Sequence, residues 1–233
     1  MRMRSIAGLM FCGLTFCPGI RAQSPDPNVA REVSELRMAM VRSNEALRQY
    51  TWTERTEILV GGNLKSAQEL LCRYNGTGEL TKTPIGENKA PDAGSAISNR
   101  PIRRSRADKQ DYVRRAISMV QTYVPPKPED LQYALQRGDA FLSLPEAGKS
   151  EIRFPHYYQQ ADSFIFTYDT ATKRLLRVSV STYLGNPKDP VTMDALFETL
   201  PDGVNHLASI TLTAKAKKLE IKRQNLDYRK IGH

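Results

Sequence analysis

The sequence has few of the residues from which common catalytic and metal sites are built. Its 233 residues include three cysteines, three histidines and one tryptophan. Cys12 and Cys17 lie near the start of the chain, so Cys72 has no partner for a disulfide in the remainder. No two histidines have the spacing of a helical metal site. We also find neither a Gly-x-Ser-x-Gly nucleophile motif nor a glycine-rich phosphate loop.

Acidic residues are more numerous, but their positions do not indicate catalysis. They fall mostly at expected turns, where Asp accepts hydrogen bonds from backbone N–H groups (Asp162, Asp169, Asp189, Asp194 and Asp202). A glycosidase would need two carboxylates facing one cleft, and nothing in the sequence pairs them. We therefore predict a protein that is not an enzyme, with no catalytic residues, no metal and no cofactor.

Long hydrophobic runs are also missing. The longest apolar stretch, residues 6–17, follows Arg2 and Arg4 and precedes Ala22. A membrane span needs about 20 apolar residues, so a short anchor is the weaker alternative. The pattern is typical of a secretory signal peptide over residues 1–22. We expect the mature chain, residues 23–233, to be a single soluble domain without a transmembrane segment, in the periplasm if the source has an outer membrane.

The charge of the chain is moderately basic. The formal net charge is +9, and removal of residues 1–22 leaves 31 basic and 25 acidic residues, a charge of +6. Because an exported protein does not meet nucleic acid, we predict no nucleic-acid partner; anionic membranes or cell-wall polymers are the natural negative partners. A solvated basic surface is the simpler alternative.

Hydrophobic periodicity predicts helices over about residues 27–50, 109–124 and 128–137, with Asp26 and Pro27 starting the first and Pro125 stopping the second. Residues 50–84 predict two or three antiparallel strands. Residues 84–108 have no periodicity and predict a flexible basic loop that ends in Arg103, Arg104 and Arg106. This arginine cluster either binds an acidic group or is solvated.

From residue 163 onward the chain alternates apolar and polar residues, as a β-meander does. The segment "LPDGVN" supplies a turn within it. The alternation changes phase near Lys217 and Lys218, which requires a bulge or a tight turn. Helices with one apolar face and alternating strands cover each other, so we predict an α+β fold in which two or three helices pack on the concave side of one curved antiparallel sheet.

This order of elements, ending in "LEIKRQNLDYR", resembles the LolA-like superfamily of periplasmic lipoprotein carriers over about residues 27–229. The resemblance implies an incomplete barrel around helices, with acyl chains held between sheet and helices, and a lipid or lipoprotein as partner. The adaptable apolar residues expected to face inward are our candidate ligand-binding residues: Met40, Met119, Tyr123, Phe164, Phe166, Tyr168, Met193 and Phe197. The alternative is an envelope protein-interaction or sensor module with a fully packed core and no ligand.

The predicted processing is directly measurable. Mass spectrometry of the exported protein should find an N-terminus close to Gln23, because signal peptidase cleaves after a small residue such as Ala22. A membrane-bound form that keeps residues 1–22 would contradict the prediction.

Overall fold

The computed structural model describes residues 26–86 and 100–232, except for the side chains of residues 100–107 and 109. The predicted signal peptide and residues 87–99 of the predicted basic loop lie outside the described residues. The elements are α1 (Pro27–Leu47), β1 (Tyr50–Val60), β2 (Asn63–Tyr74), β3 (Leu80–Pro84), α2 (Arg100–Gln121), α3 (Pro128–Gln136), β4 (Phe141–Glu146), β5 (Lys149–Pro155), β6 (Ser163–Asp169), β7 (Leu175–Tyr183), β8 (Pro190–Thr199), β9 (Asn205–Ala214), η1 (Lys215–Lys217) and β10 (Leu219–Lys230).

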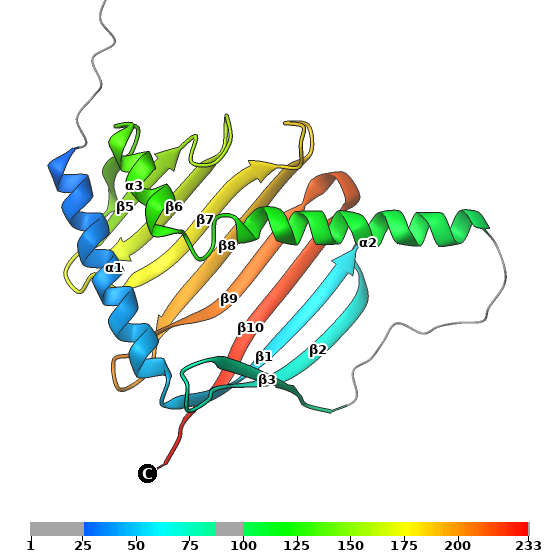
Figure 1. Ribbon diagram of the computed structural model, residues 1–233, viewed down its shortest axis with the longest axis horizontal. Coiled ribbons are helices and arrows are strands. Elements are labelled where there is room, and N and C mark those ends of the chain that lie inside the picture. Colours follow the sequence, from blue (N-terminus) through cyan, green and yellow to red (C-terminus); the bar gives the residue numbers. More distant parts are fainter. Residues whose placement is uncertain (1–25, 87–99, 233) are drawn as a thin grey trace, which may run out of the picture.

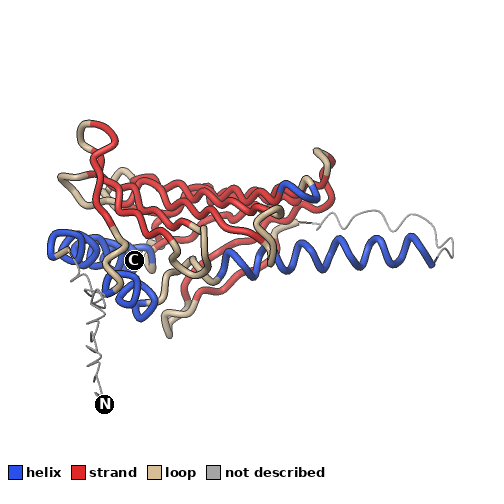
Figure 2. The backbone as a smooth tube through the Cα atoms, turned by 90° about the horizontal axis from the view of Figure 1, so that it is seen from above, coloured by secondary structure: helices blue, strands red, loops and turns tan. Residues whose placement is uncertain are grey.

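All ten strands form one open sheet in the order β3-β2-β1-β10-β9-β8-β7-β6-β5-β4, and every neighbouring pair is antiparallel. The sheet curves, and the helices lie on one of its faces (Figures 1 and 2). The predicted fold class, an α+β fold with a curved antiparallel sheet, is confirmed. The strands β4 and β5 had no strand prediction of their own.

Period-two alternation gives the sheet one apolar face and one polar face. In β5 and β6 every second residue is buried, and the residues between them are only partly buried. The outer face carries exposed or half-exposed polar groups such as Arg177, Ser179 and Asp194, which bond to one another across β7 and β8. The apolar face packs against the helices and forms the main core.

The first helix begins as predicted, because the Asp26 side chain accepts a hydrogen bond from the Asn28 N–H at 2.8 Å. It ends at Leu47 rather than near residue 50, and Tyr50 instead begins β1. The third helix and the phase change near Lys217 are also confirmed. A 3-10 turn and a left-handed Lys218 (φ 50°) separate β9 from β10 there.

The boundary of the predicted basic loop was wrong at its C-terminal end. Helix α2 begins at Arg100, so the backbone carrying Arg103, Arg104 and Arg106 is helical. In Figures 1 and 2 this N-terminal half of α2 reaches past the sheet. A helix segment with no sheet beneath it has no apolar face to bury, which is why the sequence shows no periodicity there. None of the helices in the described residues has both the length and the apolar character needed to cross a membrane.

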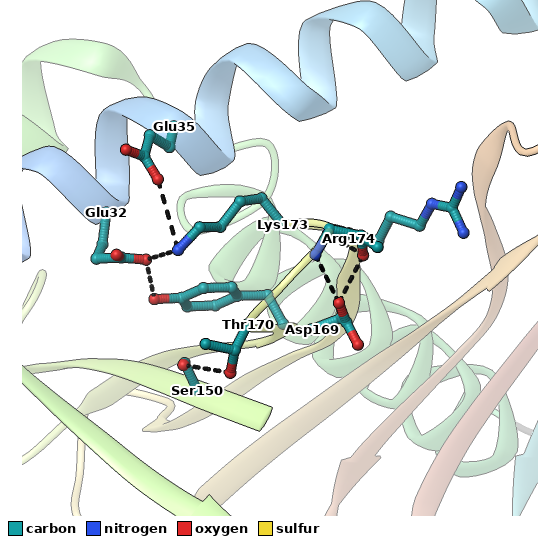
Figure 3. A network of polar contacts seen from close by, with 9 residues as sticks. Glu32, Glu35, Ser150, Asp169, Thr170, Lys173 and Arg174 are labelled. Carbon is teal, nitrogen blue, oxygen red and sulfur yellow. Dashed lines mark hydrogen bonds and ion pairs between the residues drawn. The ribbon is translucent and has the colours of Figure 1, made fainter. Parts of the chain in front are cut away.

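A buried polar contact fixes α1 on the sheet (Figure 3). The Tyr168 hydroxyl and the Lys173 ammonium both donate to Glu32 Oε2 at 2.6 Å, and Lys173 also lies 3.5 Å from Glu35. Burial raises the pKa of Glu32, but the hydrogen bonds from Lys173 and Tyr168 outweigh it and hold the pKa below the usual 4.5. The contact joins α1 to β6 and to the turn that follows β6.

We expect Glu32→Gln to lower the free energy of unfolding by about 2 kcal/mol at neutral pH, because charge-assisted hydrogen bonds to a buried carboxylate are lost. Since the folded pKa is depressed, the contribution of Glu32 is present above pH 4.5 and is lost as the pH falls through the lower folded value. Denaturant unfolding of wild type and variant should therefore converge in acid. Glu35→Gln is the matched control; its side chain is 37% exposed against 12% for Glu32. Equal effects of the two changes would contradict the role given to Glu32.

Candidate functional site

The eight predicted ligand-binding residues divide into two groups. Phe164, Phe166, Tyr168 and Met193 lie on the apolar face of β6 and β8, and Tyr123 follows α2; all five are buried in the main core. Met40, Met119 and Phe197 are only partly buried and pack against that core. The prediction that all eight face inward is compatible with these positions, but only the second group has surface that a ligand can reach without rearrangement.

The buried group is closely packed with other aromatic rings. The ring centroids of Phe164 and Phe166 are 4.6 Å apart, and those of Tyr157 and Phe164 are 4.8 Å apart. Phe154 lies 6.1 Å from Phe166 in an edge-on arrangement, and Tyr123 lies 6.2 Å from Phe164. Such distances are those of a packed aromatic core. This end of the space between sheet and helices is filled by side chains.

Tyr123 also takes part in a buried polar network that closes this end. Its hydroxyl donates to Asp162 Oδ2 at 2.6 Å and lies 2.8 Å from the Thr182 hydroxyl. The same carboxylate oxygen accepts the backbone N–H groups of Tyr158 and Gln159. Burial raises the pKa of Tyr123, and the hydrogen bond to Asp162 raises it further. The loop between β5 and β6 is thus tied to the end of α2.

Burial is graded across the sheet. Paired residues of neighbouring strands form one row on the apolar face: Ile58, Ile221, Leu212, Met193, Val180, Phe164 and Phe154. The exposed fraction is 9% at Ile221 and 5% at Leu212, 1% and 2% at Met193 and Val180, and 0% at Phe164 and Phe154. At the far end Ile58 is only partly buried. Along this row the helix cover therefore weakens toward β10 and β1, whereas Leu219 at the start of β10 is buried.

Figure 1 shows the reason, because α1 and α2 diverge over these strands. The middle of β9, β10 and β1 is visible between them, and no described helix crosses it. The elements that border this area carry partly buried apolar side chains that pack against the main core, and we call six of them the concave patch: Met40 on α1, Val113 and Ile117 on α2, Ile58 on β1, Phe197 on β8 and Ile210 on β9. Two of them, Met40 and Phe197, were predicted from the sequence.

A polar band borders the concave patch on the same face. Glu54 of β1 is nearly buried; it accepts a hydrogen bond from Lys82 Nζ at 2.7 Å, and its other oxygen lies 3.7 Å from Arg223 Nε. Asn225 is paired with Glu54 across β1 and β10. Among the described residues, the buried atoms Arg223 Nε and Asn225 Oδ1 have no hydrogen-bond partner. Buried polar atoms of this kind usually bind a partner, so the band has unused hydrogen-bonding capacity.

Beyond the band lies a second aromatic group that the sequence did not predict as a unit. Trp52 stacks on Tyr228 with centroids 5.5 Å apart, and His206 lies 4.2 Å from the Tyr228 ring. Cys72 is buried here, and burial, followed by the charge of Glu54, raises the pKa of its thiol. A thiol in that state is unreactive. No group of three or more potential metal ligands is found among the residues that the structure describes.

The open antiparallel sheet with helices on one face agrees with the architecture that the predicted LolA-like resemblance implies. No family model matches the sequence, and no curated protein matches it. The chain is similar in structure to a DUF1329 family protein from Desulfovibrio piger, with 9% identity over 89% of this chain and 94% of that chain and a TM-score of 0.41. It is also similar to a putative outer membrane lipoprotein-sorting protein domain from Vibrio parahaemolyticus, with 10% identity over 84% and 91% of the two chains and a TM-score of 0.40. A third similar structure is MucB in complex with MucA(peri), with 9% identity over 86% and 99% and a TM-score of 0.23. These likenesses concern the fold alone.

Replacing Tyr123 by Phe tests whether this residue serves the core or a ligand. We expect a loss of about 1 to 3 kcal/mol in the free energy of unfolding, because Asp162 loses a donor in a buried site. Ligand binding by the folded protein should not change. Tyr133→Phe is the matched control, since Tyr133 is 61% exposed on α3 and should have almost no effect. Stability should be followed by urea unfolding; equal stability of the two variants would contradict the structural role.

Proposed function

We propose that the protein is an exported, non-enzymatic binding protein of the cell envelope that carries an apolar ligand, the acyl chain of a lipid or lipoprotein. The observation that carries this proposal is the weakening of helix cover over β10 and β1, which leaves the concave patch partly exposed on an otherwise apolar face. Partly exposed apolar surface inside a curved sheet is favourable for an acyl chain, because each buried CH₂ contributes about 0.8 kcal/mol.

The composition of the concave patch suits such a ligand. Met40 is unbranched and flexible, and Phe197 offers a flat apolar surface, so together they can adapt to a chain of variable shape. The adjoining polar band supplies Lys82 and Arg223, whose side chains are 35% and 39% exposed. An acyl-bearing molecule has a polar end, and these two cations lie where that end would emerge from the patch.

A specific observation favours the alternative, an envelope interaction or sensor module without a ligand. The aromatic core at β5 and β6 is closely packed, so that half of the molecule has no room for an acyl chain. The two functions differ in whether the concave patch binds a ligand. In a carrier the patch binds an acyl chain, whereas in an interaction module it binds no ligand.

Phe197→Gln tests the carrier directly. We expect the affinity for a fluorescent fatty-acid analogue to fall about tenfold or more, because burial of a Phe side chain contributes about 1.5 to 3 kcal/mol. The neighbouring Leu196 is 46% exposed, and the alternation of β8 places it on the opposite face, so Leu196→Gln is the matched control and should bind as wild type does.

Native mass spectrometry of protein purified from its own envelope, with lipid extraction in parallel, supplies the independent measurement. Copurifying lipid that is reduced by Phe197→Gln supports the carrier. If no lipid or lipoprotein copurifies, and Phe197→Gln changes only the unfolding temperature, the module is the correct function.

A further inference from the structure

Exposed lysines gather at one end of the sheet. In the antiparallel order, the turns β1–β2, β7–β8 and β9–β10 lie at the same end. They and the first residues after them carry the lysines that we call the basic rim: Lys65, Lys188, Lys215, Lys217 and Lys218, all exposed. The rim extends over six neighbouring strands, from β2 to β7. At about 4.8 Å per strand this is roughly 24 Å.

Hydrogen bonds connect the turns that carry the basic rim to one another and to helix α2. The Gly61 N–H donates to the Lys218 carbonyl at 2.9 Å, which joins the β1–β2 turn to the β9–β10 turn. Helix α2 runs along this end, and its Tyr112 hydroxyl donates to Asp189 Oδ1 in the β7–β8 turn at 2.6 Å. By sequence, α2 contains seven basic and two acidic residues and adds a formal charge of +5.

The positive charge of the basic rim is not compensated locally. None of its five lysines forms an ion pair with another described residue. At the opposite end of the sheet Lys173 pairs with Glu32, Lys149 with Glu146 and Lys230 with Asp202. The lysines at the two ends of the strands thus differ in ion pairing, and the unpaired ones are available to a negative partner.

We propose that the basic rim docks on the surface of an anionic phospholipid bilayer. Lysines from three separate turns present an extended charged edge, which matches a sheet of lipid headgroups better than a single phosphate. Leu64, at the start of β2 beside Lys65, is 55% exposed on this edge. An apolar side chain among cations favours the bilayer interface over a soluble acidic polymer, because the headgroup region can bury it. The proposal does not depend on a ligand in the concave patch.

Cosedimentation with vesicles tests the rim. The purified chain should bind vesicles of phosphatidylcholine with 30% phosphatidylglycerol at low salt, should not bind pure phosphatidylcholine, and should dissociate in about 0.5 M salt as screening shortens the range of the charges. The variant K188Q/K215Q/K217Q should bind about 100-fold more weakly, at about fivefold per basic residue. Leu64→Gln should weaken vesicle binding but leave any binding to polyaspartate unchanged.

The matched control, K149Q/R174Q/K230Q, removes the same charge from the opposite end of the sheet and should bind within about threefold of wild type. Equal losses for the two triple variants would show that only net charge matters and would overturn the proposal. Wild-type binding by the K188Q/K215Q/K217Q variant, or binding to polyaspartate but not to vesicles, would also overturn it. Fatty-acid binding in solution should be unchanged in the rim variant, so failure of the docking surface and failure of the carrier are distinguishable.

Discussion

The structure depends on one constraint: ten strands that alternate apolar and polar residues produce a sheet with a single apolar face, and that face must be covered. The helices of the described residues lie on one side of the sheet, and they do not cover it evenly (Figure 2). Over β5 to β7 the inward side chains are buried, and aromatic rings fill the space at β5 and β6. Over β9, β10 and β1 the helices diverge, and Ile58 and Ile210 stay partly exposed. The candidate site is therefore the part of the apolar face of the sheet that the described helices do not cover.

The positions of the helices are fixed by a repeated interaction, a tyrosine hydroxyl that donates to a carboxylate. Tyr168 bonds to Glu32 of α1, Tyr112 of α2 bonds to Asp189, and Tyr123 after α2 bonds to Asp162. A fourth pair, Tyr50 with Asp202, closes the start of β1, and that hydrogen bond raises the pKa of Tyr50 to about 12. Each tyrosine stays protonated at neutral pH and donates a directional bond, whereas the apolar contacts around it have no direction. Burial of apolar side chains supplies most of the stability of the fold, and these hydrogen bonds select the orientation of the helices on the sheet.

The sequence was sufficient to predict the features of the fold that depend on residues close together in the chain. Alternation predicted the meander, the phase change predicted the break near Lys217, and hydrophobic periodicity predicted the helix at residues 128–137 that is α3. The start of α2 was missed because the segment after Arg100 lies beyond the sheet and needs no apolar face. The tyrosine–carboxylate pairs were also missed, since their partners are 39 to 152 residues apart and no local pattern links them. For the site, alternation showed which side chains face inward. It did not show which inward positions the helices cover, and so it grouped buried Phe164 with partly exposed Phe197.

The two asymmetries of the molecule meet on the same strands. Cover weakens toward β10 and β1, and the uncompensated lysines lie at the turns that join β9 to β10 and β1 to β2. Ile58 of the concave patch is three residues before Gly61 in that second turn, a distance of about 10 Å along an extended strand. An acyl chain on the concave patch would thus lie along strands whose basic ends face a negatively charged surface. The complete cover lies elsewhere, at β5 to β7, and the paired lysines lie at the opposite strand ends. A carrier that exchanged its ligand at a bilayer would need its least covered strands to end at the edge that docks, and in this fold β10 and β1 end at the basic rim.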